Sequence, residues 1–436
     1  MKMKSFGIVA FIVLALTYSL NAQTTNATAP ASTDGAAAFG AGLQFGSMMI
    51  NGTNYNSIRL QPDFSIGKFG VGLDLNFEFD ANGNFRTQEW STWQSILSKI
   101  LFLRWSKKEA LSPADPVYVK IGSINDFTLG HGLAVYRYSN MLNYPDIKKM
   151  GLAFDMDFGY VGFESFVGNI FDWDLMGMRI FGRPLYNSGI PMFDTLQIGA
   201  TWSVDLDPLD PVPPASTPYD FTDSPLSSPM SVYGFDASLV VFANPIIDML
   251  TYVDFVGISG KGSGEFLGVI GKVISIIPYR FELRVLQPKF LPNFFDTFYD
   301  GERATKYALL DSITNGYGGW LFSSGISLFE DKLIWTLQIE DSFDDTTKPI
   351  LTMQLLVKKE LLQKFAFKFA WIRQNIAKFE DIFSYVSTDS ILMTDIEYYV
   401  TDTLAIVLSY KRTFKLDAAG VPQEFVSTAI STKMAF

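Results

Sequence analysis

The sequence predicts an all-β protein, a transmembrane antiparallel β-barrel of about 20 strands, with an even number between roughly 16 and 20. Hydrophobic residues make up 48% of the chain and charged residues 18%, below the roughly 25% charge of ordinary globular domains. Beyond residue 22 no apolar run is long enough for a spanning helix. The apolar residues instead alternate with polar ones, and in lipid only helices and closed barrels pair every backbone group.

The N-terminal segment has the pattern of a secretory signal peptide. Lys2 and Lys4 precede an apolar run, and small residues end at Ala22. The run is shorter than the roughly 20 residues of a membrane anchor. The mature N-terminus is too short for a plug domain. We therefore divide the chain into signal peptide, disordered lead-in and outer-membrane barrel, over residues 1–22, 23–37 and 38–436.

Composition excludes several classes of protein. The chain has no cysteine, hence no disulfide and no lipid-anchored N-terminal cysteine. A net charge of -11 and a pI near 4.7 argue against a nucleic-acid partner. We find no nucleotide-binding motif, and the sequence predicts neither a cofactor nor a metal centre.

The first predicted hairpin shows the alternation most clearly. In "FGVGLDLNFEF" every second residue is apolar, and "SIRLQPDFSI" before it alternates likewise. The two segments meet at Gly67-Lys68, a two-residue hairpin turn. That turn pairs Arg59 with Asn76 and places it diagonal to Asp74.

Further strands are predicted along the whole chain. Many approach the roughly 9–11 residues of a tilted spanning strand, whereas strands of a soluble sandwich average about five to six. The segments are "GLAFDMDFG", "LQIGATWSVD", "LIWTLQIE", "KFAFKFAWIR", "TLAIVLSYKRTF" and "EFVSTAISTKMAF", and "QEWSTWQSILSKILFLRW" is read as a loop followed by a strand near 97–106.

The connections sort into short periplasmic turns and long external loops, as in outer-membrane barrels. Short turns are predicted at Gly67-Lys68, Gly159-Tyr160, Gly271-Lys272, 330–332, 359–361 and 401–403, and long loops at 80–96, 124–150, 206–231, 287–317, 374–388 and 414–424. The 206–231 loop is acidic and rich in proline. The aromatic 287–317 loop either folds inward to narrow the lumen or forms a surface helix.

Charged residues on the inner faces are the predicted pore lining. A charge facing lipid costs roughly 2–4 kcal/mol at mid-bilayer, so these side chains should face a polar lumen. They set a transverse field in a channel, or they brace the wall as a salt-bridge network. The candidates are Arg59, Asp63, Asp74, Glu78, Arg179, Arg183, Arg280, Glu282, Arg284, Lys368 and Lys411.

Two further clusters are candidate sites. A turn at Gly159-Tyr160 places Asp155 opposite Glu164 with Asp157 beside them, a candidate cation site. His131, the single histidine, is interpreted as a loop residue between glycines. A hydrolase using it with Ser139 and Asn140 lacks any recognisable motif, so no enzymatic activity is predicted.

The chain resembles the bacterial outer-membrane β-barrel class, through its signal peptide, its alternating strands and the final "FVSTAISTKMAF". Two stretches, "YVKIGSINDFTLGHG" and "KKMGLAFDMDFGYVGFESFVG", look like segments of barrels of spirochaete and Bacteroidetes type. The resemblance implies location in the cell outer membrane of a Gram-negative-type envelope. It also implies that Ile430, Met434 and Phe436 form a signal for the barrel-assembly machinery, and that the last strand pairs with "FGAGLQFGSMMI".

These observations predict a porin-like channel for passive diffusion of small polar solutes, with outer-membrane lipid and the assembly machinery as partners. One alternative is a transporter for a hydrophobic ligand such as a fatty acid, gated by the 287–317 loop. Another is a surface adhesin or scaffold barrel that binds through the 206–231 loop.

Deleting Phe436, or adding a charged tail after it, should impair assembly because the closing strand loses its recognition signal. We expect reduced surface levels but unchanged single-channel conductance in the molecules that do assemble. Quantitative surface labelling measures the first and planar-bilayer recording the second. Normal surface levels of the deletion variant would refute the assignment.

Overall fold

The computed structural model describes residues 37–50, 53–108, 111–141, 148–209, 228–296, 299–344, 349–373, 376, 390–400, 404–416 and 422–435. The predicted signal peptide and Phe436 lie outside these residues, as does the predicted lead-in apart from Ala37, where the first strand begins.

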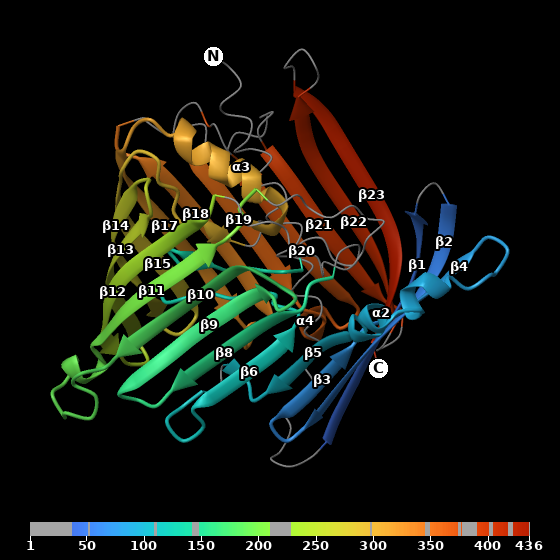
Figure 1. Cartoon of the computed structure of the whole chain (residues 1–436), viewed down its shortest axis with the longest axis horizontal. Coiled ribbons are helices and arrows are strands. Elements are labelled where there is room, and N and C mark those ends of the chain that lie inside the picture. The colour runs from blue at the N-terminus through green and yellow to red at the C-terminus, as the bar shows by residue number, and fades with distance from the viewer. Residues whose placement is uncertain are drawn as a thin grey trace.

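A single antiparallel sheet forms the wall of the molecule (Figure 1). It holds 21 named strands, of which β3 and β4 are two halves of one strand, so 20 strands follow one another around the wall. The first half of the wall contains β1 (Ala37–Ile50), β2 (Thr53–Ile66), β3 (Phe69–Leu73), β4 (Leu75–Asp80), β5 (Ile100–Trp105), β6 (Val117–Gly122), β8 (Gly151–Asp157), β9 (Val161–Asn169), β10 (Asp172–Gly182), β11 (Gln197–Asp205) and β12 (Met230–Ala243).

The second half continues with the same antiparallel pairing. It contains β13 (Ile247–Ile258), β14 (Ser263–Val273), β15 (Ile277–Leu286), β17 (Tyr317–Leu328), β18 (Leu333–Ser342), β19 (Ile350–Val357), β20 (Phe365–Arg373), β21 (Ser390–Tyr399), β22 (Leu404–Leu416) and β23 (Pro422–Ala435). The ring closes because β1 pairs with β23, from Gly42 opposite Ala435 to Phe45 opposite Thr432. The predicted barrel, its strand number and its closing pair are confirmed.

Apolar side chains cover the outside and polar ones the inside. In β15 Phe281, Leu283 and Val285 are exposed, while Glu282 and Arg284 between them are buried. This alternation follows from the period of two in a strand, which sends successive side chains to opposite faces. The same division recurs in β12, where Phe235 is 60% exposed and its neighbour Asp236 is 9% exposed.

The predicted hairpin turns are mostly confirmed. Phe69 pairs with Ile66 across Gly67-Lys68, and Arg59 pairs with Asn76 as expected. The turn predicted at Gly271-Lys272 is wrong, because both residues lie inside β14.

The true turn in that hairpin spans residues 274–276, and Val273 pairs with Ile277. Ile274 and Ser275 adopt left-handed backbone angles there, with φ of 45° and 62°. Tight hairpin turns need such angles but usually obtain them from glycine or asparagine. The sequence therefore carried no turn signal at this position.

Most of the long connections leave from one end of the barrel, but residues 183–196 connect β10 to β11 at the other end, where β1 begins and β23 ends. Residues 210–227 of the predicted acidic loop, and much of the loops at 374–388 and 414–424, lie outside the described residues. Among the other connections, η1 (Thr87–Trp90) and α2 (Trp93–Leu97) precede β5, where only a loop was predicted before the strand. η3 (Phe193–Thr195) and α4 (Lys359–Leu362) lie at the end with the shorter turns.

Two long connections fold into the barrel, and we call them the first inserted segment (123–141) and the second inserted segment (287–316). The second contains α3 (Tyr299–Ser312), seen across the lumen in Figure 1. The two meet where β7 (Val135–Tyr136) and β16 (Phe295–Asp296) pair in parallel.

A shared apolar core fixes the inserted segments against the inner wall. Its buried wall residues all come from the β8–β15 part of the barrel, namely Ala153, Phe166, Leu175, Met230, Val232, Val256, Ile258, Phe266 and Leu286.

The structure combines parts of the two expectations for 287–317. The connection forms a helix, as the second expectation had it, but it folds inward, as the first had it. The first inserted segment was predicted as an external loop, and its inward fold is a correction. Its segment "DFTLGHGLAVYRYS" has many apolar residues, and most of them pack in the shared core inside the barrel.

Within the described part of the chain, no helix is long and apolar enough to cross a membrane.

Replacing Leu310 with alanine should loosen the second inserted segment, because Leu310 is fully buried in the shared core. A cavity of this kind costs about 2–5 kcal/mol. We expect faster hydrogen exchange of the α3 amides than in wild type. Thr305→Ala, at an exposed position on the same helix, is the control and should leave exchange unchanged. Equal exchange in both variants would contradict the inward packing of α3.

Candidate functional site: a charged constriction around His131

The first predicted charge pair lies where the sequence placed it. Arg59 Nε donates to Asp74 Oδ1 at 2.6 Å, and Asp74 is fully buried. Lys148 Nζ lies 3.3 Å from the other oxygen of Asp74. Glu78 pairs with Arg86 at 2.6 Å. The wall of this hairpin is therefore braced by opposite charges.

A second charge network lies on β15. Glu282 is fully buried and accepts hydrogen bonds from Arg284 Nε at 2.5 Å and Arg280 Nη2 at 2.7 Å. Arg284 also donates to Glu340 on β18 at 2.8 Å. Tyr252 donates its hydroxyl to Glu282 at 2.5 Å. The three predicted residues of β15 thus form one network, which reaches β13 and β18, each two strands away.

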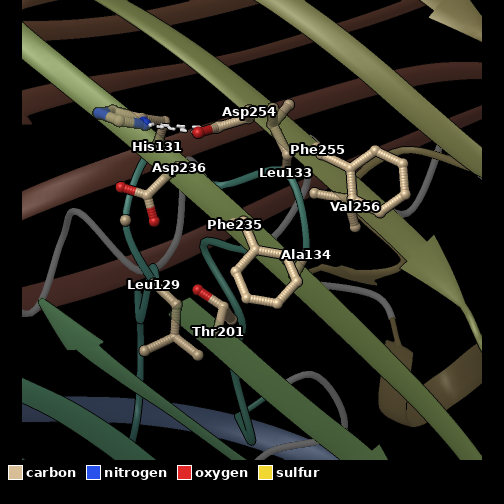
Figure 2. A pocket seen from close by; sticks show the side chains of 12 residues that line it. Leu129, His131, Leu133, Ala134, Thr201, Phe235, Asp236, Asp254, Phe255 and Val256 are labelled. Atoms are coloured by element: carbon tan, nitrogen blue, oxygen red, sulfur yellow. Dashed lines mark hydrogen bonds and ion pairs between the residues drawn. The ribbon is translucent and has the colours of Figure 1, made fainter. Parts of the chain in front are cut away.

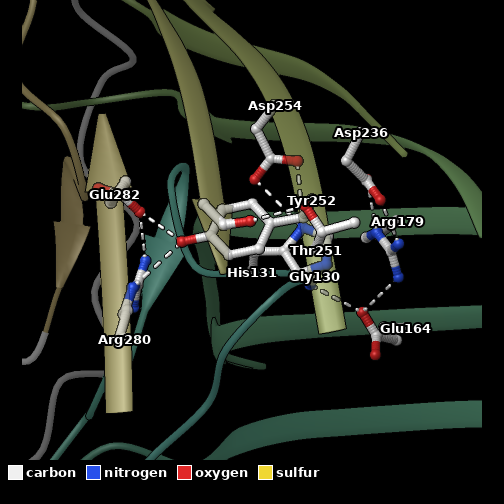
Figure 3. Close-up of polar contacts among 11 residues, drawn as sticks. Gly130, His131, Glu164, Arg179, Asp236, Thr251, Tyr252, Asp254, Arg280 and Glu282 are labelled. Atoms are coloured by element: carbon white, nitrogen blue, oxygen red, sulfur yellow. Dashed lines mark hydrogen bonds and ion pairs between the residues drawn. The ribbon is translucent and has the colours of Figure 1, made fainter. Parts of the chain in front are cut away.

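Arg179 forms the centre of a third network, shown in Figure 3. Its Nη2 and Nε donate to the two oxygens of Asp236 on β12, at 2.6 and 2.9 Å. Its Nη1 lies 3.5 Å from Glu164 on β9. Glu164 in turn accepts a hydrogen bond from the backbone N–H of Gly130 at 3.1 Å. Arg179 therefore links three wall strands with the first inserted segment.

The candidate cation site at Asp155, Asp157 and Glu164 is not assembled. The register is as predicted, with Asp155 opposite Glu164. Each carboxylate, however, has its own basic partner, at 3.0 Å from Lys108, 2.7 Å from Arg183 and 3.5 Å from Arg179 respectively. Arg183, which follows β10, forms an ion pair with Asp157 at the end of the barrel with the shorter turns.

The remaining predicted residues are placed by the strand register. Lys368 is buried and lies opposite Asp395 on the neighbouring strand, and Lys411 lies opposite Met393. Asp63 pairs with Gly72 but is exposed near the turn. Of the predicted assembly signal, Ile430 and Met434 pair with Leu408 and Leu404.

His131 occupies a position that the sequence did not predict. Its Nδ1 lies 3.1 Å from Asp254 Oδ1 on β13, and its ring stacks on Tyr252 with 4.4 Å between ring centroids. The imidazole thereby joins the Arg179 and Glu282 networks through the neighbouring strands β12 and β13. Together with the Gly130–Glu164 hydrogen bond, it brings the first inserted segment into contact with the charged wall.

The glycines on both sides of His131 allow the backbone to approach the wall closely. Gly130 and Gly132 have φ of 55° and 91°, which side chains rarely adopt. A Cβ at Gly130 would lie 2.9 Å from Arg179 Nε, and one at Gly132 would lie 2.5 Å from a ring carbon of Tyr136. Both conformation and space therefore require glycine here.

Ser139 and Asn140 do not form a catalytic group with His131. Asn140 accepts from the N–H of Ile124 at 2.8 Å and donates to the carbonyls of Gly122 and Gly168 at 3.2 and 3.0 Å. Ser139 accepts from the N–H of Met141. These bonds anchor the base of the first inserted segment to the wall.

An ionic cluster anchors α3 in the same way. Arg303 donates to Asp205 at 2.7 and 2.9 Å and to Asp174 at 3.1 Å, while Tyr299 donates to Asp205 at 2.7 Å. Burial, reinforced by the Asp205 carboxylate, raises the pKa of Tyr299 well above its usual value. Burial opposes the charge of Arg303, but Asp205 outweighs it and raises the pKa of the guanidinium. Tyr299 therefore stays neutral and Arg303 stays charged at any physiological pH.

Sequence reasoning did not single out Asp236, Asp254, Tyr252 or Arg303. Asp236 and Asp254 follow the alternation of "YGFDASL" and "YVDFVG", so inward carboxylates could have been read there. His131, the partner of Asp254, and Arg303, the partner of Asp205, lie on connections, which have no period that predicts a contact.

No protein-family model matches the chain, and no curated protein sequence matches it. Among solved structures, the chain is similar to a mutant of the ferric enterobactin receptor PfeA of Pseudomonas aeruginosa, with 10% identity over 92% of this chain and 73% of that one, and a TM-score of 0.41. It is similar to Wzi of Escherichia coli, described as an outer membrane protein and carbohydrate-binding β-barrel, with 11% identity over 97% and 87% of the two chains and a TM-score of 0.37. It is also similar to the outer membrane protein OpdK of P. aeruginosa, with 9% identity over 92% and 99%, and a TM-score of 0.36.

Likenesses this distant carry no argument about what this chain binds or transports. The specific link to barrels of spirochaete and Bacteroidetes type stays a prediction.

Replacing Asp205 with asparagine should weaken the anchor of α3, because buried Arg303 then loses the carboxylate that accepts two of its hydrogen bonds. Breaking a buried pair in this way costs about 3–5 kcal/mol. Thermal unfolding followed by near-UV circular dichroism should show a lower midpoint. Asp311→Asn is the matched control on α3, since Asp311 is exposed and pairs with Lys261 and Lys289 at the surface. Equal midpoints for both variants would show that the cluster does not stabilise the fold.

Proposed function

We propose that the protein is an outer-membrane channel for the passive diffusion of small polar solutes. The observation that carries the proposal is the distribution of side chains on the ring of strands, which is the reverse of that in a soluble protein. Apolar side chains cover its outside, and paired charges line its inside. Such a surface suits lipid, because neighbouring strands pair around the ring and the charges avoid the hydrocarbon.

The passage lies along the part of the wall that the inserted segments leave uncovered. The buried wall residues of their core come from β8–β15, and Tyr118 of β6 and Tyr317 of β17 pack at its margins. Residues paired across β18, β19 and β20 continue the inner face that begins at Glu340, because directly paired residues share a face of the sheet. The polar members of this face are Thr336, Gln338, Thr352, Gln354 and Lys368. This lining suits hydrated polar solutes.

Charged groups gather where the first inserted segment meets the wall. His131 lies on the inserted segment and contacts Asp254 on β13, and Arg280, Glu282 and Arg284 lie on β15 of the same wall. Alternating charges across a narrow pore favour polar solutes over apolar ones. The same charge pairs brace the wall, so both interpretations of the inner charges apply together.

The alternative of a hydrophobic-ligand transporter has weaker support. Phe290, Phe294 and Phe295 of the second inserted segment are at most 3% exposed. Their rings pack in the shared core rather than along a passage, so they offer no aromatic gate to a ligand. The adhesin alternative depends on the acidic loop, whose residues 210–227 lie outside the described part. We propose no enzymatic step.

Purified protein in planar bilayers should conduct ions, and replacing residues 125–138 with a short Gly-Ser linker should raise the single-channel conductance severalfold. The physical reason is that this segment fills lumen cross-section. Circular dichroism of the variant verifies that the barrel is intact.

Absence of conductance in both proteins would overturn the channel proposal. Equal conductance in both would retain a channel but refute the constriction. Liposome swelling with neutral sugars of increasing size supplies the size limit for solutes.

A further inference from the structure

We propose that His131, Asp236 and Asp254 bind one divalent cation, which ties the first inserted segment to the barrel wall. The imidazole and the two carboxylates each offer one donor atom, and these atoms all lie within 4.8 Å of one another. The three residues come from three elements, since His131 is on the inserted segment, Asp236 on β12 and Asp254 on β13.

The donor set matches the ligand chemistry of zinc. Zn²⁺ takes imidazole nitrogen and carboxylate oxygen together, whereas calcium and magnesium favour oxygen alone. Imidazole also suits other first-row transition metals, so the site should take Zn²⁺, Co²⁺ or Ni²⁺ before Ca²⁺.

Local charge favours a cation at this place. Asp236, Asp254 and Glu164 are three carboxylates, and of the described residues Arg179 is the one arginine or lysine that forms an ion pair with them. Nearby Arg280 and Arg284 are already engaged by Glu282 and Glu340. Asp236 and Asp254 are at most 9% exposed, and an uncompensated buried charge is costly. A divalent cation would neutralise this excess of negative charge.

There is room for an ion beside these side chains. His131, Asp236 and Asp254 all border a cavity of about 20 Å³ (Figure 2). That volume corresponds to about one water molecule. The rest of its border is mainly apolar, with Leu129, Leu133 and Val256. The polar end of the cavity is therefore the end with the three donors.

The existing hydrogen bonds are compatible with a metal. Arg179 contacts both oxygens of Asp236, but each carboxylate oxygen has two lone pairs and keeps one. Carboxylates that bind metals are regularly hydrogen-bonded by a second group.

The cation would act as a clamp on the constriction. Without it, His131 is tied to the wall by a single hydrogen-bonded carboxylate and by its stacking on Tyr252. With it, two wall strands and the segment share one ion. This inference does not depend on the channel proposal, because binding is measured without transport.

Isothermal titration of Zn²⁺ into detergent-solubilised protein lacking any His-tag should show one high-affinity site per chain. His131→Ala and Asp254→Asn should each bind at least tenfold more weakly. Glu330→Gln is the control, because Glu330 lies in a turn with its side chain 88% exposed, and it should bind like wild type. Ca²⁺ should not compete at the same concentration.

The chain has one histidine, so its imidazole signals give a second measurement that needs no variant. Zn²⁺ should shift these signals in wild-type protein by one equivalent. Unshifted signals would overturn the proposal, and so would unchanged zinc affinity in folded His131→Ala protein. Circular dichroism establishes that each variant is folded.

Discussion

The pairing of β1 with β23 is the contact on which the rest of the structure depends. It joins strands whose paired residues lie almost 400 positions apart, from Gly42 with Ala435 to Phe45 with Thr432. Through these four residue pairs the 20-stranded sheet becomes a ring, whereas a sheet left open in lipid would expose two edges of unpaired backbone donors and acceptors. A closed ring also creates an inside, and only then do the inward side chains meet one another.

The inside imposes its own requirement, since charges removed from water must be paired. The wall satisfies it by placing opposite charges on neighbouring strands, as in Arg59 with Asp74 and Arg284 with Glu340. The inserted segments meet the same requirement through Arg303 and Asp205. Stability and selectivity thus depend on the same side chains. A substitution that alters the charge of the passage also alters the fold, which limits how the passage can vary.

Much of the wall could be predicted, and the candidate site could not. Arg59 and Asp74 were paired correctly because a two-residue turn fixes the register of a whole hairpin. Asp155 was placed opposite Glu164 for the same reason, but their cations Lys108 and Arg179 were missed. His131 was interpreted as a loop residue, although it contacts Asp254, 123 positions further along the chain. Connections lack a period, so nothing local indicates where they fold.

The sequence by itself determined the class of fold, the strand order and the polarity of the two faces, because these follow from a local period of two and from short turns. It also determined which end carries the long connections. Only the tertiary structure decided that two of those connections enter the barrel, that Phe127 and Phe295 share one core, and that His131 reaches β13. Such contacts depend on packing between segments far apart in the chain, and that packing exists only once the ring has closed.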